Sequence, residues 1–327
     1  MVVSSVVRVL ITGATGFAGR HLSAHCAALG HEVHGLVRHG REGALPPGVV
    51  AHAADLGDPA SVAGVLERSA PGGVVHLAGA SSVGRSFAEP VATWDVNLGG
   101  TIGVLEGLRL AAPATPALIV TSGEIHGRVP LEDLPVTERT PLNPVSPYGA
   151  SKAAADLAAG QYRAAYGVHA IRVRAFNHVG PGQDPRFVLP NVARQIARAE
   201  RDGRDGVEVA VGNLDTRRDF IDVRDMVRAY VLLLEKGDPD AVYLACGGES
   251  LPVRRLIEGL APLARIPVAF RSDPGLRRDG EQPDLYGSPA RLRADTGWIP
   301  EIPIETTLAD TLDWWRARVA SENEDEE

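Results

Sequence analysis

A tyrosine, a lysine and a serine are spaced in this sequence so that they could form an acid–base site. In PVSPYGASKAAAD, Tyr148 and Lys152 are four residues apart, on one face of a helix that Pro147 can open. An ammonium group near a phenol favours the phenolate, so we expect Lys152 to lower the pKa of Tyr148 and make it a general acid or base. Upstream, IVTSGEIHG presents Ser122 and Glu124 at the end of an apolar run. Ser122 could donate to a substrate oxygen or cap the end of a strand, and the pattern predicts redox chemistry at a carbinol or ketone carbon.

A glycine-rich segment near the N-terminus has the spacing of a dinucleotide-phosphate loop. RVLITGATGFAGRHL places three glycines between an apolar run and a helical pattern. Glycines let the backbone turn tightly and approach a pyrophosphate, and the helix N-terminus offers free N–H groups and the positive end of its dipole. The residues that we expect in this part of a cofactor site are Gly13, Thr15, Gly16, Phe17, Ala18 and Gly19.

The residue after the second apolar run favours NADP(H) over NAD(H). Such folds usually carry Asp or Glu there for NAD, whereas GLVRHGRE carries Arg38, which suits a 2′-phosphate unless it is only a surface arginine. After the third run come Asp55 and Leu56, and Asp55 could accept a hydrogen bond from the amino group of the adenine. Asp55 could instead cap the next helix, although Asp58 is better placed for that role. The small residues after the fourth run would let the backbone pass close to a cofactor ribose, and those that we expect at the cofactor are Leu77, Ala78 and Gly79.

These residues require a sheet that brings them to one edge. The apolar runs VVRVLI, EVHGLV, GVVAH, GGVVHLAG, ALIVTS and HAIRVRAF are typical of strands buried on both faces. Helices are expected between them, at 19–29, 59–69, 91–110 and 147–166. Strict alternation predicts an α/β fold with a doubly wound parallel (Rossmann) sheet, in which ligands bind at the carboxyl ends of the strands. Asp156, in the last helix, is expected to be exposed.

After residue 176 the alternation breaks at a Gly/Pro-rich stretch, and a smaller C-terminal α/β lobe that binds the substrate is expected. The predicted division is an NADP-binding Rossmann domain of 1–176 and about 221–247, a lobe of 177–220 and 248–318, and an acidic tail of 319–327.

The composition narrows the function classes. The net charge is -8, from 33 basic and 41 acidic side chains, so nucleic-acid binding is disfavoured. Two cysteines in apolar surroundings suggest neither a disulfide nor a thiolate metal site, and the histidines have no metal-ligand spacing. No 18-residue apolar stretch and no leader pattern occur, so we expect a cytoplasmic enzyme with no membrane partner.

Several segments together resemble the extended short-chain dehydrogenase/reductase family, in its branch that modifies GDP-hexoses. They are TGATGFAGRHL, LAGASSVGRSF, WDVNLGGT, TSGEIHG, SPYGASK, FNHVGPGQ, RRDFIDVRD and RRDGEQPDLYGSPARLRADTGWIP, and the resemblance covers about residues 7 to 317. It implies NADP(H), a nucleotide-sugar substrate with GDP as the nucleotide, and a homodimer. In such a dimer the helices expected at 91–110 and 147–166 would form a four-helix contact, although their small residues could serve only packing within the chain.

Two enzymes of this branch compete. The GDP-mannose 4,6-dehydratases usually carry Thr-Ser-Glu, a Tyr before the next Gly, and Ser-Pro-Arg-Arg-Gly after Phe-Asn-His. Here Gly123, His126 and the VGPGQ loop stand at those positions and are similar to GDP-4-dehydro-6-deoxy-mannose reductase, or GDP-rhamnose synthase, although Glu124 and GNLDTRRDF fit the dehydratase. We therefore expect NADPH-dependent reduction of the C4 ketone of a GDP-4-dehydro-6-deoxy-hexose. The alternatives are a 4,6-dehydratase that uses Glu124, a nucleotide-sugar epimerase, and a non-catalytic NADP-sensing regulator.

The same resemblance implies a substrate site. Asn177 precedes the loop that contacts the diphosphate. His178 either contacts the cofactor or is a buried imidazole whose hydrogen bonds are made within the chain. Arg218 and the pair Arg278 and Glu281 match positions that hold the diphosphate and the nucleotide ribose, although Arg218 could belong to a plain ion-pair cluster. The residues expected at the substrate are Ser81, Glu124, Asn177, Val188, Asn191, Arg218, Arg278 and Glu281.

Overall fold

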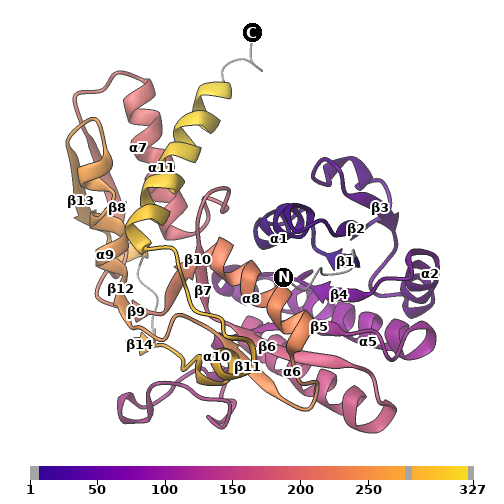
Figure 1. Cartoon of the computed structure of the whole chain (residues 1–327). Coiled ribbons are helices and arrows are strands. Elements are labelled where there is room, and N and C mark those ends of the chain that lie inside the picture. The colour runs from indigo at the N-terminus through magenta and orange to yellow at the C-terminus, as the bar shows by residue number, and fades with distance from the viewer. Residues whose placement is uncertain (1–6, 277–281, 323–327) are drawn as a thin grey trace.

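The computed structural model describes residues 7–276 and 282–322, and a seven-stranded parallel sheet lies at its centre (Figure 1). The strand order is β11-β6-β5-β4-β1-β2-β3, so the order reverses between β1 and β4, as in a doubly wound sheet. The strands are β1 (Arg8–Thr12), β2 (Glu32–Val37), β3 (Val50–Ala53), β4 (Gly73–His76), β5 (Ala117–Ser122), β6 (Ala170–Ala175) and β11 (Val242–Ala245). The predicted Rossmann class is confirmed.

Helices cover both faces of the sheet. One face carries α1 (Phe17–Ala28), α8 (Val223–Lys236) and α10 (Ala290–Thr296), and the other carries α2 (Pro59–Ser69), α5 (Gly100–Ala111) and α6 (Pro147–Tyr166). Because successive side chains of a strand point to opposite faces, Val9 and Ile11 of β1 pack on the face that carries α1 and α8, while Leu10 packs on the face that carries α2 and α5. Burial on both faces is the physical reason for the unbroken apolar runs in the sequence.

Local signals set the limits of two helices. Asp58 caps α2 by accepting a hydrogen bond from the N–H of Ala60 at 3.0 Å, as expected. Ser146 caps α6 by accepting from the N–H of Gly149 at 3.0 Å, and Gly167 ends that helix with φ +70°. The predicted ranges of both helices are confirmed.

The helix predicted at 91–110 is confirmed, and it contains a π-helical turn. After α3 (Val83–Ala88), the chain is helical without a break through α4 (Pro90–Trp94), the π-helical turn (Asp95–Gly99) and α5. Asn97 lies in this turn and makes side-chain bonds to the Ala80 N–H and to Ser151, at 2.8 and 2.9 Å. A π-helical turn in an α-helix commonly marks a functional site, because it redirects a side chain.

A second hydrophobic core lies beside the sheet, around α7 (Val188–Arg201) and α11 (Ile304–Ser321). Its other elements are β8 (Val207–Val211), paired in parallel with β13 (Val268–Ser272), and α9 (Val253–Glu258). Short strands join this core to the sheet: β7 (Asn177–Val179) with β10 (Phe220–Asp222), and β9 (Arg217–Arg218) with β12 (Leu251–Pro252) and β14 (Asp284–Leu285). Single 3₁₀ turns occur at Glu42–Ala44, Gly123–His126, Leu131–Asp133, Ala261–Leu263 and Pro274–Leu276. The residue limits of the two predicted domains stay a prediction.

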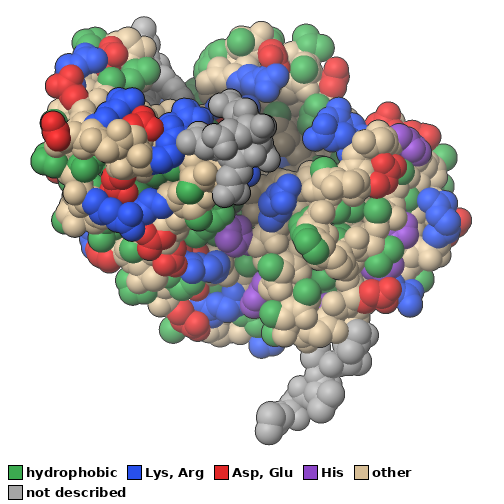
Figure 2. Space-filling view, turned by 90° about the horizontal axis from the view of Figure 1, so that it is seen from above, with side chains coloured by type: hydrophobic (Ala, Val, Ile, Leu, Met, Phe, Trp, Pro, Cys, Tyr) green, Lys and Arg blue, Asp and Glu red, His purple; other side chains and the backbone are tan. Residues whose placement is uncertain are grey.

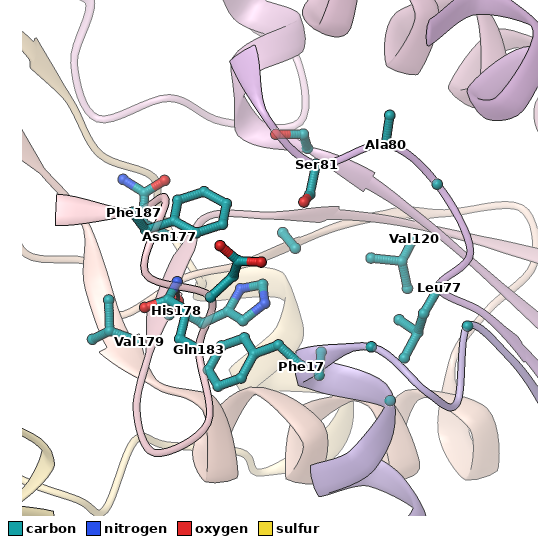
Figure 3. Close-up of a pocket in the computed structure, with 18 of the residues that line it drawn as sticks. Phe17, Leu77, Ala80, Ser81, Val120, Asn177, His178, Val179, Gln183 and Phe187 are labelled. Carbon is teal, nitrogen blue, oxygen red and sulfur yellow. Dashed lines mark hydrogen bonds between the residues drawn. The ribbon is translucent and has the colours of Figure 1, made fainter. Parts of the chain in front are cut away.

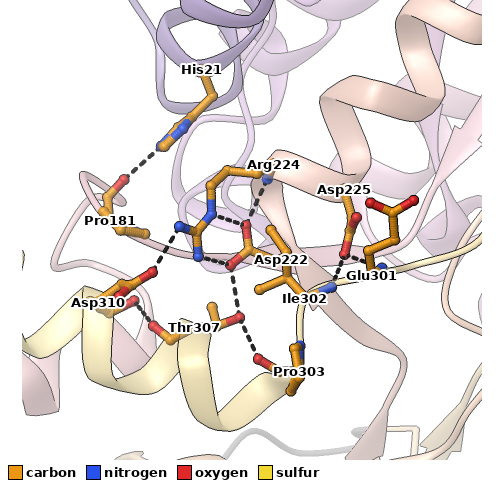
Figure 4. A network of polar contacts seen from close by, with 11 residues as sticks. His21, Pro181, Asp222, Arg224, Asp225, Glu301, Ile302, Pro303, Thr307 and Asp310 are labelled. Atoms are coloured by element: carbon orange, nitrogen blue, oxygen red, sulfur yellow. Dashed lines mark hydrogen bonds and ion pairs between the residues drawn. The ribbon is translucent and has the colours of Figure 1, made fainter.

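A polar cluster joins α8 to α11 (Figure 4). Arg224 pairs with Asp222 and with Asp310, each at 2.7 Å, and the Thr307 hydroxyl donates to Asp222 at 2.8 Å. Asp225 accepts two backbone N–H bonds from the segment that leads into α11. The C-terminal helix is therefore held to the sheet-bound helix by charge-assisted hydrogen bonds.

Both cysteines are buried and unpaired, as their apolar surroundings predicted. Burial raises the pKa of the Cys26 thiol to about 12. Within residues 7–276 and 282–322, no helix has the length and apolar character needed to cross a membrane.

Asp156 is fully buried, so the expectation that it is exposed is wrong. Arg174 of β6 donates to both of its carboxylate oxygens, at 3.0 and 3.2 Å, and the Thr121 hydroxyl of β5 donates at 3.4 Å. The partner charge comes from a strand 18 residues away, which helical spacing does not reveal. This ion pair fixes α6 to the sheet.

Replacing Asp156 should therefore destabilise the fold strongly. Asp156→Ala leaves the buried Arg174 guanidinium without its carboxylate, which costs about 3–5 kcal/mol of unfolding free energy. Urea unfolding followed by circular dichroism measures this loss. The control is Asp240→Ala, which removes an exposed pair with Arg163 and should cost less than about 1 kcal/mol. Equal effects of the two substitutions would contradict the structural role of Asp156.

Candidate active site

A cleft of about 630 Å³ opens at the carboxyl edge of the sheet, where the second core meets it. Figure 2 shows basic side chains around a hollow on this side of the molecule, and Figure 3 shows the interior. Most of the predicted site residues line the cleft: Gly13, Thr15, Gly16, Phe17, Ala18, Gly19, Leu77, Gly79, Ser81, Ser122, Tyr148, Lys152, Asn177, His178 and Val188. Their convergence from distant segments makes this cleft the candidate active site.

Other predicted residues lie outside the lining. Among the described residues these are Arg38, Asp55, Leu56, Ala78, Glu124, Asn191 and Arg218. Arg278 and Glu281 lie outside the described residues, so their predicted roles stay predictions.

Hydrogen bonds within the chain explain several of these positions. The Arg218 guanidinium donates to the carbonyl oxygens of Arg217 and Gln282, at 2.7 and 2.8 Å, so it is not directed into the cleft. Asp55 accepts from the N–H of Gly57 at 2.9 Å, which closes a local turn. Arg38 is exposed one residue after β2. These bonds use one nitrogen of Arg218 and one oxygen of Asp55, so the predicted ligand contacts of both residues stay predictions.

The glycine loop forms a cradle that fits a dinucleotide. Gly13 has φ +75°, and a Cβ there would lie 2.8 Å from the backbone nitrogen of Ala78. A Cβ on Gly19 would collide with the carbonyl of Gly13. Gly16 begins α1 without a side-chain cap, so the first N–H groups of the helix remain available to an anion. This is the arrangement that the pyrophosphate of a dinucleotide requires.

Ser122, Tyr148 and Lys152 lie together at the end of β5 and the start of α6, with Ser122 and Lys152 buried and Tyr148 half-buried. Ser122 is close enough to Tyr148 to lower its pKa. Its Oγ accepts from the N–H of Glu124 at 3.2 Å, so the capping role is present, and donation to a substrate oxygen stays a prediction. Lys152 donates from Nζ to the Val120 carbonyl at 3.2 Å.

Burial dominates the acid–base properties of this group. Desolvation raises the pKa of Tyr148 to about 12, opposed by the Ser122 hydrogen bond and assisted by the Glu124 charge. Desolvation also lowers the pKa of Lys152 to about 8. The expectation that Lys152 lowers the pKa of Tyr148 is therefore wrong for this structure, and Tyr148 is a protonated phenol at neutral pH.

A chain of buried hydrogen bonds positions α6 against the cleft. Asn97 accepts from the N–H of Ala80 and donates to Ser151, whose hydroxyl donates to the Tyr148 carbonyl at 2.8 Å. A Cβ on Gly79 would lie 2.8 Å from the Asn97 oxygen and 3.2 Å from Lys152 Nζ. Asn97 thus supports both sides of the cleft. We had noted it only within the WDVNLGGT segment, and its side-chain contacts depend on the π-helical turn.

The loop after β7 closes one side of the cleft. The His178 ring stacks on Phe17 of α1, with ring centres 5.9 Å apart, and its Nδ1 is hydrogen bonded to the Phe176 carbonyl at 3.1 Å. Gln183 donates from Nε2 to the His178 carbonyl at 3.2 Å. Across the loop, His21 of α1 is hydrogen bonded to the Pro181 carbonyl at 2.8 Å, as Figure 4 shows. His178 therefore lines the cleft and has a hydrogen-bond partner within the chain, and its predicted contact with the cofactor stays a prediction.

Several lining residues were not among the predicted site residues, and those with larger side chains include Arg20, Gln183, Asp184, Arg186, Phe220 and Tyr230. Gln183, Asp184 and Arg186 lie in or directly after the Gly/Pro-rich loop that follows Asn177, so the position of that loop was a signal for them. Tyr230 carries no such signal, because in an amphipathic helix it resembles a core residue.

Comparisons with known proteins agree with this geometry. The profile of the family described as GDP-mannose 4,6 dehydratase matches residues 10–311. GDP-6-deoxy-D-mannose reductase of Pseudomonas aeruginosa is 38% identical over 315 residues, covering 96% of this chain and 99% of that protein. GDP-mannose 4,6-dehydratase of Vibrio cholerae is 28% identical over 351 residues, covering 93% and 92%. The solved structure of RMD from Pseudomonas aeruginosa complexed with NADPH has a TM-score of 0.82 at 36% identity, covering 95% of this chain and 99% of that chain.

The titration of Lys152 can be observed directly. The sequence contains two lysines, Lys152 and Lys236, so protein labelled with ¹³C-lysine gives two Cε signals. We expect the Lys152 signal, identified by its loss in Lys152→Met, to titrate near pH 8 because burial disfavours the ammonium.

Stability should follow the same titration. The folded chain holds its Lys152 proton less tightly than the unfolded chain, whose ordinary value is 10.5, so stability rises with pH between about 8 and 10.5. Lys152→Met should raise the unfolding free energy at pH 7 by up to about 3 kcal/mol, and this gain should disappear by pH 10.5. A gain that persists at pH 10.5 would exclude the buried ammonium as its source.

Proposed function

The chain belongs to the GDP-mannose 4,6 dehydratase family, a branch of the extended short-chain dehydrogenase/reductases, and we propose that it reduces the C4 ketone of a GDP-4-dehydro-6-deoxy-hexose with NADPH. The observation that carries the proposal is that Ser122, Tyr148 and Lys152 line one cleft together with the glycine-rich phosphate cradle. Near full-length similarity to a GDP-6-deoxy-D-mannose reductase supports the same reaction. We place the reaction in the cytoplasm, in keeping with two buried, unpaired cysteines.

The residues present fit NADP(H). Gly13, Gly16 and the N-terminus of α1 would hold the pyrophosphate, and Lys152 lies where it would meet the nicotinamide ribose. Arg38, exposed after β2, suits the 2′-phosphate that distinguishes NADP from NAD. When bound, the cofactor supplies the hydride.

The side chains supply the rest of the chemistry. Ser122 can donate a hydrogen bond to the ketone oxygen and hold it near Tyr148. With its pKa raised to about 12, Tyr148 keeps its proton at neutral pH and can transfer it to the oxygen as negative charge develops there. Lys152 keeps a positive charge beside this oxygen below about pH 8. This set is suited to protonating an alkoxide, which is the requirement of a reductase.

Glu124 is the residue on which the dehydratase alternative depends. It is half-buried and lies outside the cleft lining, while its backbone N–H is bonded to Ser122. An acid–base residue that eliminates water would have to reach the substrate. Its position therefore supports reduction, and Gly182 and Gln183 at the place of the dehydratases' basic segment agree with this choice.

The reaction is tested with two incubations. Purified protein should oxidise NADPH when given GDP-4-dehydro-6-deoxy-mannose, and should form no ketone from GDP-mannose and NADP. Tyr148→Phe should lower the rate of reduction about 10²- to 10⁴-fold, because the proton donor is lost. Glu124→Gln should change this rate by less than about tenfold.

Other results point to the alternatives. A 4-keto product from GDP-mannose that disappears in Glu124→Gln would show a dehydratase, and C4 inversion with no net change of cofactor would show an epimerase. NADP binding with no turnover, unchanged by Tyr148→Phe, would show a non-catalytic regulator.

The exposed apolar side chains of α4, α5 and α6 support a homodimer. Val91 and Leu157 are 72% and 60% exposed, and Trp94, Ile102 and Tyr166 are also exposed. Exposed apolar side chains gathered on neighbouring helices mark an association surface, because their contact with water is unfavourable. In a dimer with a two-fold axis, each copy would cover this surface of the other copy.

A charge on α6 should break this dimer. We expect the wild type to sediment as a dimer and Leu157→Arg as a monomer, because the arginine would be buried against its own copy. Leu29→Arg is the control, since Leu29 is 51% exposed at the end of α1, on the other face of the sheet. A wild type that sediments as a monomer at micromolar concentration would contradict the dimer.

A further inference from the structure

Tyr230 places a polar group without a partner in the wall of the cleft. It lies on α8, its side chain is fully buried, and it lines the cleft. Its hydroxyl makes no hydrogen bond to any part of the chain that the structure describes. Because a buried hydroxyl without a partner destabilises a folded chain, a phenylalanine would serve the core better at this position.

A second buried tyrosine shows how this chain treats a hydroxyl that has only a structural role. Tyr243 is also fully buried, and its hydroxyl donates to Asp295 at 2.7 Å and accepts from the N–H of Asp238 at 2.9 Å. Tyr230 has no such pair. Because Tyr230 lines the cleft, a ligand bound there can supply the partner of its hydroxyl.

The Tyr230 hydroxyl lies at the reacting end of the cleft. The charge of Tyr148 contributes to the raised pKa of Tyr230, so the two phenols are within electrostatic reach of each other. Val120 and Leu77 line the same cleft and are apolar. The phosphate end is marked by the N-terminus of α1, so a dinucleotide bound there would extend its redox end towards Tyr230.

Topology identifies the ligand that Tyr230 faces. Tyr148 and Lys152 approach from α6, on one face of the sheet, whereas Tyr230 approaches from α8, on the opposite face. α8 packs against α1, the helix that begins at the phosphate cradle. Tyr230 thus approaches the cleft from the face of the sheet that carries α1 and the phosphate cradle, opposite Tyr148 and Lys152.

We propose that the Tyr230 hydroxyl donates a hydrogen bond to the carboxamide oxygen of the bound nicotinamide and so positions the ring. The carboxamide is the one polar substituent of that ring, and a phenol among apolar side chains is a matching donor. This inference rests on the proposed use of NADP(H). It gives Tyr230 a positioning role, separate from the proton transfer by Tyr148.

The test compares two ligands and two variants of the full chain. One ligand is NADPH, and the other is 2′-phospho-ADP-ribose, which lacks the nicotinamide ring. Dissociation constants are measured by calorimetry, and melting temperatures are measured with and without each ligand. Tyr230→Phe should weaken NADPH binding about three- to tenfold, the effect of losing one hydrogen bond, and leave 2′-phospho-ADP-ribose binding unchanged. Its melting temperature without ligand should equal or exceed that of the wild type.

Tyr243→Phe is the matched control. It removes two hydrogen bonds within the chain, so it should lower the melting temperature without ligand and leave both dissociation constants unchanged. Loss of NADPH affinity in Tyr230→Phe and loss of thermal stability in Tyr243→Phe would together show that the Tyr230 hydroxyl bonds to the ligand and the Tyr243 hydroxyl bonds within the chain.

Three results would overturn the inference. One is wild-type affinity of Tyr230→Phe for NADPH, and another is an equal loss of affinity for both ligands. The third is a lowered melting temperature with unchanged binding, which would show a structural hydroxyl. If the wild type bound neither ligand, the proposed function would fail as well, so the two failures are distinguishable.

Discussion

Asp156 and Arg174 form an ion pair buried between α6 and β6, and this pair holds the helix that carries Tyr148 and Lys152. A buried charge without its partner would strongly destabilise the fold, so the pair fixes the position of the helix on the sheet. Ser146 at the start of α6 and Ser151 one turn later add local bonds to this anchor. The acid–base group is thus positioned by interactions that themselves take no part in the chemistry.

The same burial that holds the site also sets its protonation states. Desolvation favours the neutral form of every ionisable group, so it raises the pKa of Tyr148 and lowers that of Lys152. For a reductase this is useful, because the phenol must carry a proton before the reaction begins. Hydrophobic packing and proton donation are in this way two results of one environment.

The cleft joins two kinds of surface. The side that we propose for the cofactor is made of backbone that approaches closely, at Gly13 and Gly79, and of α1 and α8 behind it. Its other side is made of the loop after β7, which is fastened to α1 by the His21 and His178 contacts. The polar cluster at Arg224 holds the C-terminal helix near this loop. The substrate side therefore depends on several long-range contacts, whereas the cofactor side depends on few.

The sequence by itself determined the elements whose signals are local. Alternating runs and caps determined the sheet and helices such as α2 and α6, and contiguous motifs determined the glycine cradle and the Tyr148–Lys152 pair, because each depends on residues a few positions apart. Tertiary structure alone decided which groups pair across the fold. It turned Arg218 to backbone carbonyls, buried Asp156 against Arg174, placed a π-helical turn at Asn97 and brought Tyr230 to the cleft. The physical reason is that burial, charge pairing and unmet hydrogen bonds depend on neighbours in space, which spacing along the chain does not specify.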